Sequence, residues 1–522
     1  MTENRRVFLN VVATYGRSLY GLALGLLCGR WTLMALGTVD YGLNGLVGGL
    51  TAFIAFFNGV LAGANARFYA VSIGQARVAA DKASALEESR RWFNTALAVH
   101  AAVPLVLIAV GYPVGAYAVE HWLTIPADRV AACVWVFRFV CVSCFVGMVG
   151  VPFSAMYGAK QYIAELTIYS FATSTLNAAV LYYMVSHPQT WLVPYAGWTC
   201  LASVVPQLVI CVRAACIFPE CKIVPGYLFD KARLRHLGVY SGWQMFGCIC
   251  GILRTNGLAI VVNKFFGAAM NAAQAVGNQV QAQCSQLSGA MQTAFVPVIT
   301  QAFGEGDYRK MNVFVTRTCK FNVFLSLIFM IPLAIELPEV MTLWLVHPPA
   351  FAVGLCYCAM ILHLVSSATV GHMVAVNATG KIAAYHVVLC AVNVMLLPCC
   401  VLVGFLTRDI YAMMAVAIVF EALNSAGRIY FARRHAQSSA REWLRFVGAP
   451  SVLLTALCAL VGVVPRLLLP ASFGRIVLTT GACELVLLPL LWTLILNDDE
   501  RRFVKEKVAD RILGRALRAL RG

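Results

Sequence analysis

Apolar segments of membrane-spanning length recur along the whole of this 522-residue chain. An α-helix needs about 20 apolar residues to cross the hydrocarbon core of a bilayer. The chain is 60% hydrophobic and 12% charged, whereas soluble domains are roughly half apolar and a quarter charged. These features predict an all-α polytopic membrane protein with about fourteen transmembrane helices and no sizeable soluble domain. The predicted spans are residues 9–35, 41–65, 92–118, 129–157, 161–185, 190–215, 237–263, 268–303, 313–336, 350–377, 382–406, 409–433, 446–465 and 474–496.

Lys and Arg are concentrated in every second loop between these segments. The loop after the second span contains Arg77, Lys82 and Arg90, among others, whereas the loop after the third contains only Arg129. Cytoplasmic loops of membrane proteins carry such an excess of positive charge. The pattern therefore predicts that both termini are cytoplasmic and that the number of spans is even. The net charge of +17 follows from this topology and does not indicate nucleic-acid binding.

The second half of the chain repeats the pattern of the first half. Residues 111–181 and 331–397 share an order of motifs, with Lys160 matching Lys381. The end of the second span, GVLAGANARFYAVSIG, also parallels the end of the eighth, AMQTAFVPVITQAFG. A parallel repeat about an axis along the membrane normal is a transporter architecture, with the substrate site between the two halves.

This repeat divides the chain into five predicted parts. They are an N-terminal six-helix lobe (1–216), a cytoplasmic linker (217–236), a C-terminal six-helix lobe (237–435), two additional transmembrane helices (436–497) and a basic amphipathic cytoplasmic tail (498–522). The tail has apolar residues on one helical face and basic residues on the other. This pattern predicts a helix that lies on the anionic inner leaflet.

Residues 243–304 combine membrane-length apolar character with polar side chains in the interior. Arg254 and Asn256 lie within the seventh span, and polar residues recur at steps of three and four along the eighth. An unpaired polar group in hydrocarbon costs several kcal/mol, so these side chains are expected to face protein or a water-filled cavity. The polar stripe of the eighth span comprises Asn271, Gln274, Asn278, Gln281, Ser285, Ser288 and Gln292.

Three arginines inside the spans suggest a site for an anionic substrate, most readily a phosphate. Arg17, Arg138 and Arg254 each lie well within an apolar segment, and a guanidinium can bind phosphate through two parallel hydrogen bonds. The alternative is that each arginine pairs with backbone or a glutamate, or extends to the membrane interface. The candidate glutamates are Glu165, Glu336, Glu339 and Glu421. The candidate substrate-binding residues are Arg17, Arg138, Arg254, Asn256, Asn271, Gln274, Asn278, Gln281 and Gln292.

Nothing in the sequence predicts a metal, a cofactor or a catalytic centre. The 19 cysteines are scattered through apolar segments without metal-ligand spacing. A membrane glycan polymerase or ligase would need catalytic groups that converge in an external loop. The polar residues of the predicted external loops, Glu120, His121, Asp128 and Asp409, are isolated. A non-enzymatic role is therefore expected, with the polymerase or ligase as an alternative.

Two motifs resemble a known superfamily. The segment RWTLMALGTVDYGLNGLVGGL at 30–50 and the segment NKFFGAAMNAAQAVGNQV at 263–280, together with two six-helix lobes, resemble the polysaccharide-exporter branch of the multidrug/oligosaccharidyl-lipid/polysaccharide flippase superfamily. The resemblance covers about residues 5–435. A total of fourteen spans is similar to the lipid II flippase branch.

The resemblance implies a flippase of the bacterial cytoplasmic (inner) membrane. It would move an undecaprenyl-pyrophosphate-linked oligosaccharide, a precursor of polysaccharide or lipopolysaccharide biosynthesis, to the outer leaflet by alternating access. Glycan polymerase or ligase components are the implied protein partners. The arginines suit a pyrophosphate, and the Asn and Gln stripes suit sugar hydroxyls.

The main alternative is a cation-coupled multidrug exporter of the same superfamily. Such exporters use acidic residues in the lobes to bind sodium, protons or cationic drugs. The first span of this chain contains no Asp or Glu, and the seventh contributes Arg254. The electrostatics therefore favour the flippase over an exporter of cations.

Overall fold

The computed structural model describes residues 52–122, 125–187, 191–345 and 349–504, together with scattered residues between 10 and 47. Most of the first predicted span and most of the basic tail lie outside these residues. The described part is helical throughout and contains no strand. Nine of its helices are long and apolar enough to cross a membrane, and a bent pair makes a tenth. The prediction of an all-α polytopic membrane protein is confirmed.

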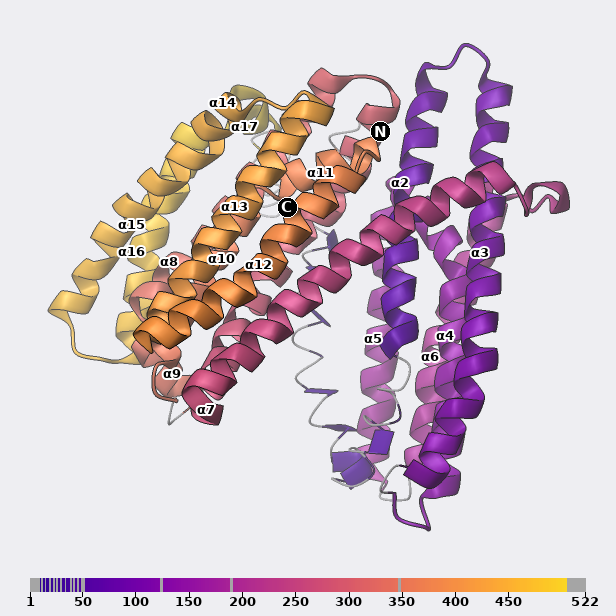
Figure 1. Ribbon diagram of the computed structural model, residues 1–522, viewed down its shortest axis with the longest axis horizontal. Helices are drawn as coiled ribbons and strands as arrows, with labels where there is room; N and C mark the ends of the chain where they lie inside the picture. Colours follow the sequence, from indigo (N-terminus) through magenta and orange to yellow (C-terminus); the bar gives the residue numbers. More distant parts are fainter. Residues whose placement is uncertain are drawn as a thin grey trace, which may run out of the picture.

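Among the residues from 52 onward that the structure describes, five helices form one bundle, here called the N-terminal lobe, on the right of Figure 1. Predicted spans two to six all appear as helices in it. The helices are α2 (Ala52–Val78), α3 (Lys82–Tyr117), α4 (Val130–Ala159), α5 (Ile163–Ser186) and α6 (Leu192–Ile217), with a short π-helical turn η1 (Ala118–Trp122) after α3.

The second bundle, the C-terminal lobe, lies to the left (Figure 1). Its helices are α8 (Tyr308–Ile335), α9 (Leu337–Leu345), α10 (Ala352–Ser367), α11 (Val370–Thr379), α12 (Ala383–Thr407) and α13 (Ile410–Ala436). The single predicted span 350–377 is broken into α10 and α11, which meet at 42°. The later elements are α14 (Ala440–Trp443), η4 (Leu444–Gly448), α15 (Ala449–Leu468), α16 (Phe473–Leu490), η5 (Leu491–Ile495) and α17 (Asp498–Val504).

The segment α7 (Lys231–Gly304) connects the two lobes, and its first half crosses the molecule diagonally in Figure 1. Sequence analysis predicts two separate spans here. The structure agrees with this: α7 consists of two helices that meet at a kink at Gly267, whose φ of 80° and ψ of −178° are not helical, and Lys231–Gly267 is a candidate span by itself. Only glycine adopts such a positive φ without steric cost, so this one residue turns the chain between the two halves of α7.

The helix α7 begins at Lys231, inside the segment 217–236 that sequence analysis predicts as the linker. Asp230 caps the helix, because its carboxylate accepts hydrogen bonds of 3.1 Å from the backbone N–H groups of Ala232 and Arg233. The bond from the Arg233 N–H, above all, lowers the pKa of the Asp230 carboxyl below its ordinary value. The extended linker therefore ends at Asp230, and it includes the short turns η2 (Pro219–Cys221) and η3 (Pro225–Tyr227).

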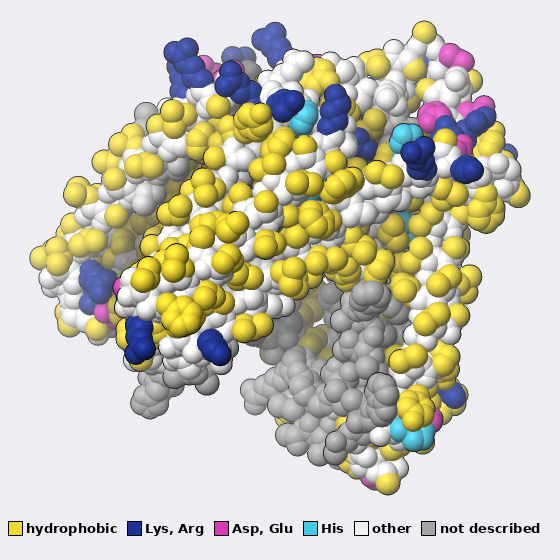
Figure 2. Space-filling view, viewed as in Figure 1, with side chains coloured by type: hydrophobic (Ala, Val, Ile, Leu, Met, Phe, Trp, Pro, Cys, Tyr) yellow, Lys and Arg dark blue, Asp and Glu magenta, His cyan; other side chains and the backbone are white. Residues whose placement is uncertain are grey.

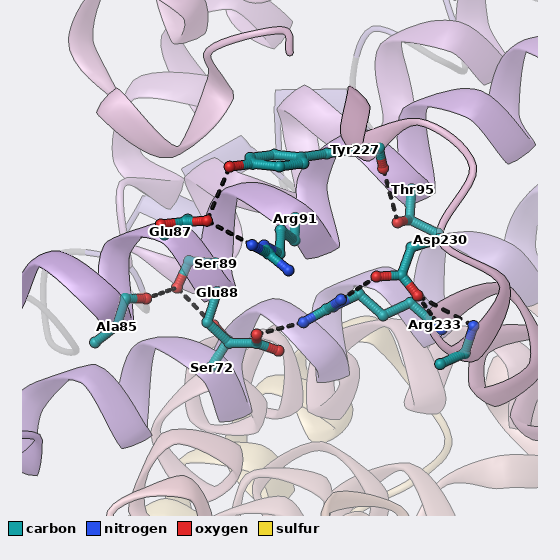
Figure 3. Close-up of polar contacts among 11 residues, drawn as sticks. Ser72, Ala85, Glu87, Glu88, Ser89, Arg91, Thr95, Tyr227, Asp230 and Arg233 are labelled. Atoms are coloured by element: carbon teal, nitrogen blue, oxygen red, sulfur yellow. Dashed lines mark hydrogen bonds and ion pairs between the residues drawn. The ribbon is translucent and has the colours of Figure 1, made fainter. Parts of the chain in front are cut away.

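The linker is bound to the N-terminal lobe by a cluster of polar contacts (Figure 3). Glu87 on α3 accepts hydrogen bonds from Arg91 at 2.6 Å and from the Tyr227 hydroxyl at 2.8 Å. The Arg91 guanidinium also lies over the Tyr227 ring, 4.8 Å from its centre. One turn into α7, Arg233 forms an ion pair with Glu88. These contacts attach the first turn of α7 to the N-terminal lobe.

The two additional helices pack on the C-terminal lobe at α8. An apolar cluster includes Leu327 on α8, Leu454 on α15 and Leu487 on α16. Below it, Arg475 of α16 forms ion pairs with Glu336 at 2.8 Å and Glu339 at 2.6 Å. The side chains of Arg475 and Glu336 are only 6% and 1% exposed. A buried charge must be paired, so this cluster fixes α16 to α8 and α9.

We expect Arg475→Leu to destabilise the protein, because it leaves Glu336 and Glu339 without the cation that pairs with both of them. Unfolding of the purified protein in detergent by denaturant measures the change. The matched control is Lys264→Leu, which removes an exposed cation of α7. Equal stability of the two variants would show that the buried ion pairs do not hold the additional helices.

Candidate functional site

The two lobes meet where the ends of α2 and α7 cross. A Cβ atom on Gly74 would clash with the backbone of Gln301, and a Cβ atom on Gly304 would clash with the backbone of Val71. Gly74 thus faces Gln301, which lies three residues before Gly304, and Gly304 faces Val71, which lies three residues before Gly74. The two segments are the ones that the sequence repeat relates. The two copies of the repeated segment, at the ends of α2 and α7, are therefore in backbone contact with each other. The two contacts are related by a local two-fold axis.

Side chains extend this crossing into the opposite lobe in both directions. Arg67 of α2 donates from Nε to the carbonyl oxygens of Asn377 at 2.8 Å and Ala378 at 3.1 Å, near the end of α11. Gln301 of α7 donates to the carbonyl of Ala159 at the end of α4. The last carbonyls of a helix have no partner within that helix. Each crossing helix therefore satisfies the corresponding helix end of the other lobe.

An ion pair completes the contact between the lobes. Arg77, at the end of α2, lies 2.9 Å from a carboxylate oxygen of Glu305, which directly follows α7. Lys310 binds the other oxygen of Glu305 at 3.1 Å. Figure 2 shows many Lys and Arg side chains along the upper margin of the molecule, above the apolar surfaces of the lobes. We call the end that carries the crossing the basic end.

A second polar cluster lies inside the C-terminal lobe around Glu421 of α13, whose side chain is 3% exposed. One carboxylate oxygen lies 2.6 Å from Nη1 of Arg254 on α7, and the other lies 3.3 Å from Nη2 of Arg428 on α13. The pairing with Glu421, one of the predicted alternatives, is therefore the one found for Arg254. Because one carboxylate is shared by two guanidinium groups, the cluster carries a surplus positive charge.

Arg428 also binds the break between α10 and α11. Its Nη1 donates to the Ser366 carbonyl at 3.2 Å and to the Thr369 hydroxyl at 3.2 Å. Ser425, one turn earlier on α13, donates to the Val365 carbonyl at 3.0 Å. Broken helices are tolerated in membranes where neighbouring side chains satisfy the freed backbone groups. The cluster thus connects Arg254 on α7 to a broken helix, a common element of transporter sites.

The other two predicted arginines lie apart from this cluster. Arg138 is exposed on α4, donates to the Tyr112 hydroxyl at 2.9 Å and lies over the Trp135 ring at 4.8 Å. Arg17 is half-buried in a helical segment of the first predicted span. Neither forms a hydrogen bond or an ion pair with Arg254 or Glu421 among the described residues.

The polar stripe of the second half of α7 is divided between buried and exposed positions. Gln274 is buried, and its carbonyl oxygen has no hydrogen-bond partner in the described part of the chain. Ser285 is exposed and its hydroxyl lies 3.1 Å from Nδ1 of His363 on α10. Asn278 is exposed, as is Asn256 in the first half of α7. Gln281 and Gln292 are half-buried, and the side chain of Asn271 lies outside the described residues.

Sequence reasoning missed Arg428 as a site residue because it counted this arginine among the loop charges after the twelfth span. The missed signal was the spacing of seven residues from Glu421, which places both side chains on one face of a helix. The contacts of Ser366 and Thr369 with Arg428 could not be predicted in this way, because they depend on the break between α10 and α11.

No protein-family model matches the chain, and no curated protein matches it. Several solved structures are similar to the chain. An outward-facing multidrug resistance MATE family transporter of the MOP superfamily has a TM-score of 0.66 at 13% identity, covering 84% of this chain and 97% of its own. A MATE structure in the bent conformation has a TM-score of 0.63 at 13% identity, covering 84% and 96%.

A third similar structure is a MOP superfamily transporter from Pyrococcus furiosus, with a TM-score of 0.64 at 12% identity, covering 84% of this chain and 98% of its own. Its description states that the reverse polarity of its binding pocket suggests a different function. The fold is that of the MATE transporters of the MOP superfamily. At these identities, the similarity shows the fold of the chain.

The glycine crossing can be tested directly. We expect Gly74→Leu to prevent the close approach of α2 and α7, because the added side chain would overlap the backbone of Gln301. Hydrogen exchange of the backbone amides near Val71 and Gln301 should become at least about tenfold faster. The matched control is Gly63→Leu on the same helix, where a Cβ meets nothing within 4 Å. Unchanged exchange in a folded Gly74→Leu protein would contradict the crossing.

Proposed function

We propose that this protein is an exporter of amphiphilic compounds that works by alternating access between its two lobes. The observation that carries the proposal is the reciprocal crossing of Gly74 and Gly304, which joins the lobes at the basic end of a MATE-like fold. This contact combines the close backbone approach with the hydrogen bonds of Arg67 and Gln301 and the ion pair of Arg77, and we propose that these are made and broken together. Breaking it would open the basic end.

The charge pattern supports an orientation for this cycle. The basic end carries the Lys- and Arg-rich loops, which face the cytoplasm in most membrane proteins. In this proposal both termini are cytoplasmic, the protein lies in the bacterial inner membrane, and the state described here is closed toward the cytoplasm. Cargo would then leave toward the opposite side.

The structural neighbours support export of the multidrug class better than a flippase of lipid-linked sugars. The charges around Glu421 restrict which compounds of that class could be cargo. A cationic cargo needs an available carboxylate, whereas Glu421 already lies between Arg254 and Arg428. We therefore propose neutral or anionic amphiphiles as cargo, with Arg254 as the residue that contacts them. The remaining candidate contacts are Arg17, Arg138, Asn256, Asn271, Gln274, Asn278, Gln281 and Gln292.

The same surplus charge favours a second candidate, an undecaprenyl-pyrophosphate-linked oligosaccharide. Arginine binds phosphate oxygens through two hydrogen bonds, and exposed amides such as Asn256 and Asn278 can bind sugar hydroxyls. A flippase of this kind would act with glycan polymerase or ligase components in polysaccharide biosynthesis. The flippase and the exporter of amphiphiles would use the same transport cycle and would differ in their cargo.

Transport in proteoliposomes separates the candidates. An anionic dye, a cationic dye and a prenyl-pyrophosphate-linked sugar are tested in parallel for protein-dependent transfer. We expect transfer of the anionic dye, or of the lipid-linked sugar if the second candidate is correct. Transfer of the cationic dye alone would contradict the charge argument.

We expect Arg254→Ala to reduce the rate of transfer at least about tenfold, because a charge-assisted hydrogen bond contributes roughly 1.5–3 kcal/mol. The protein should still fold, since Glu421 keeps Arg428 as its partner. Lys264→Ala, which removes an exposed cation from the same helix, is the control. Normal transfer by a well-folded Arg254→Ala variant would exclude Arg254 from the site.

A further inference from the structure

A cavity of about 770 Å³ lies at the basic end of the N-terminal lobe, separate from the cluster around Glu421. It is formed by the end of α2, the start of α3, the turn between α4 and α5, the end of α6 and the start of the linker. Its charged lining residues are Arg77, Lys82, Lys160, Glu165, Arg213 and Glu220.

The carboxylates of this cavity are already paired. Lys160 lies 2.6 Å from Glu220, and Arg213 binds Glu165 through its Nε. Within the described ranges, Lys82 donates to neutral groups, the carbonyl oxygens of Ala76 and Arg77 at the end of α2, at 2.9 and 2.8 Å. The Arg213 side chain is 50% exposed, and the bond that it makes to Glu165 uses the Nε. Four cations and two carboxylates leave a positive surplus in the cavity.

Arg77 belongs to this cavity and to the crossing of the lobes at the same time. It lines the cavity from α2, and it binds Glu305 of the other half of the chain at 2.9 Å. Glu305 is in turn bound by Lys310. An anion in the cavity would therefore compete with Glu305 for the Arg77 guanidinium.

We propose that this cavity binds the phosphate group of a ligand, and that its occupancy weakens the Arg77–Glu305 pair between the lobes. Arg and Lys side chains on several elements suit a phosphate, which offers oxygens in several directions. The exposed Tyr162 and Ile217, which also line the cavity, give the chains of a lipid an apolar surface. The phosphate can thus belong to an anionic lipid headgroup or to a soluble compound.

Binding is measured on the full-length protein without any transport step, so the result is independent of the proposed export. In one arm, inorganic phosphate is titrated against the detergent-solubilised protein, with chloride at matched ionic strength, and the melting temperature is followed. In the other, native mass spectrometry records the retention of phosphatidylglycerol, compared with phosphatidylcholine, which carries the same phosphate without net charge.

We expect retention of phosphatidylglycerol over phosphatidylcholine. A response to inorganic phosphate as well would assign the site to the phosphate group itself, whereas a response to the lipid alone would assign it to a headgroup in the membrane. The absence of both responses in the wild-type protein would overturn the proposal.

Variants locate the site. Lys82→Gln and Arg213→Gln should each weaken binding about tenfold, because each removes a charged donor from the cavity. Lys82 is exposed and bonds only to carbonyl oxygens, so Lys82→Gln keeps the fold intact. Lys222→Gln removes an exposed linker cation that does not line the cavity and should leave binding unchanged. Equal binding by all three variants would place the anion elsewhere.

The coupling to the crossing has its own test. Glu305→Gln removes the competitor for Arg77, so phosphate or phosphatidylglycerol should bind several-fold more tightly. Glu442→Gln, which removes an exposed carboxylate from α14, controls for the change in net charge. Equal affinity in the two variants would show that Arg77 is not shared between the cavity and Glu305.

Discussion

The arrangement of the two lobes depends on the close approach of Gly74 to the backbone of Gln301 and of Gly304 to the backbone of Val71. Two glycines allow two helices to approach until each lies against the other's backbone, and a single methyl group at either position would separate them. The hydrogen bonds of Arg67 and Gln301 reach the opposite helix ends only because the helices are this close. The N-terminal lobe also holds the linker, so the first turn of α7 moves with that lobe.

Charge inside the C-terminal lobe determines which cargo the protein can accept. A carboxylate in a membrane lobe attracts cations only when it has no closer partner. Glu421 is enclosed between Arg254 and Arg428, and Arg428 is itself held by the broken helix at Ser366 and Thr369. The fold alone is compatible with several cargos. The pairing of this one glutamate is the feature that argues against cations.

Much of the fold follows from the sequence because each span is long and apolar enough to be recognised by itself. The repeat also indicates that the ends of α2 and α7 correspond. It cannot show that they touch, since the contacts join Gly74 to Gln301 and Val71 to Gly304, residues that lie 227 and 233 positions apart in the sequence. Glu421 could be named as a partner of Arg254 because carboxylates in the spans are few. The break after Ser367 could not be predicted, because it contains no proline and depends on hydrogen bonds from α13.

The two halves of the crossing are alike in backbone and opposite in charge. The segment that ends in Gly74 is followed by Arg77, whereas the segment that ends in Gly304 is followed by Glu305. Two identical copies of the N-terminal segment would place Arg77 opposite a neutral side chain, because Gln75 is the residue that corresponds to Glu305. Opposite charges convert the same geometry into an attraction. They also leave the cation on the N-terminal lobe, beside Lys82 and Arg213. The asymmetry that holds the lobes together therefore also explains why the anion-binding cavity lies on the N-terminal lobe.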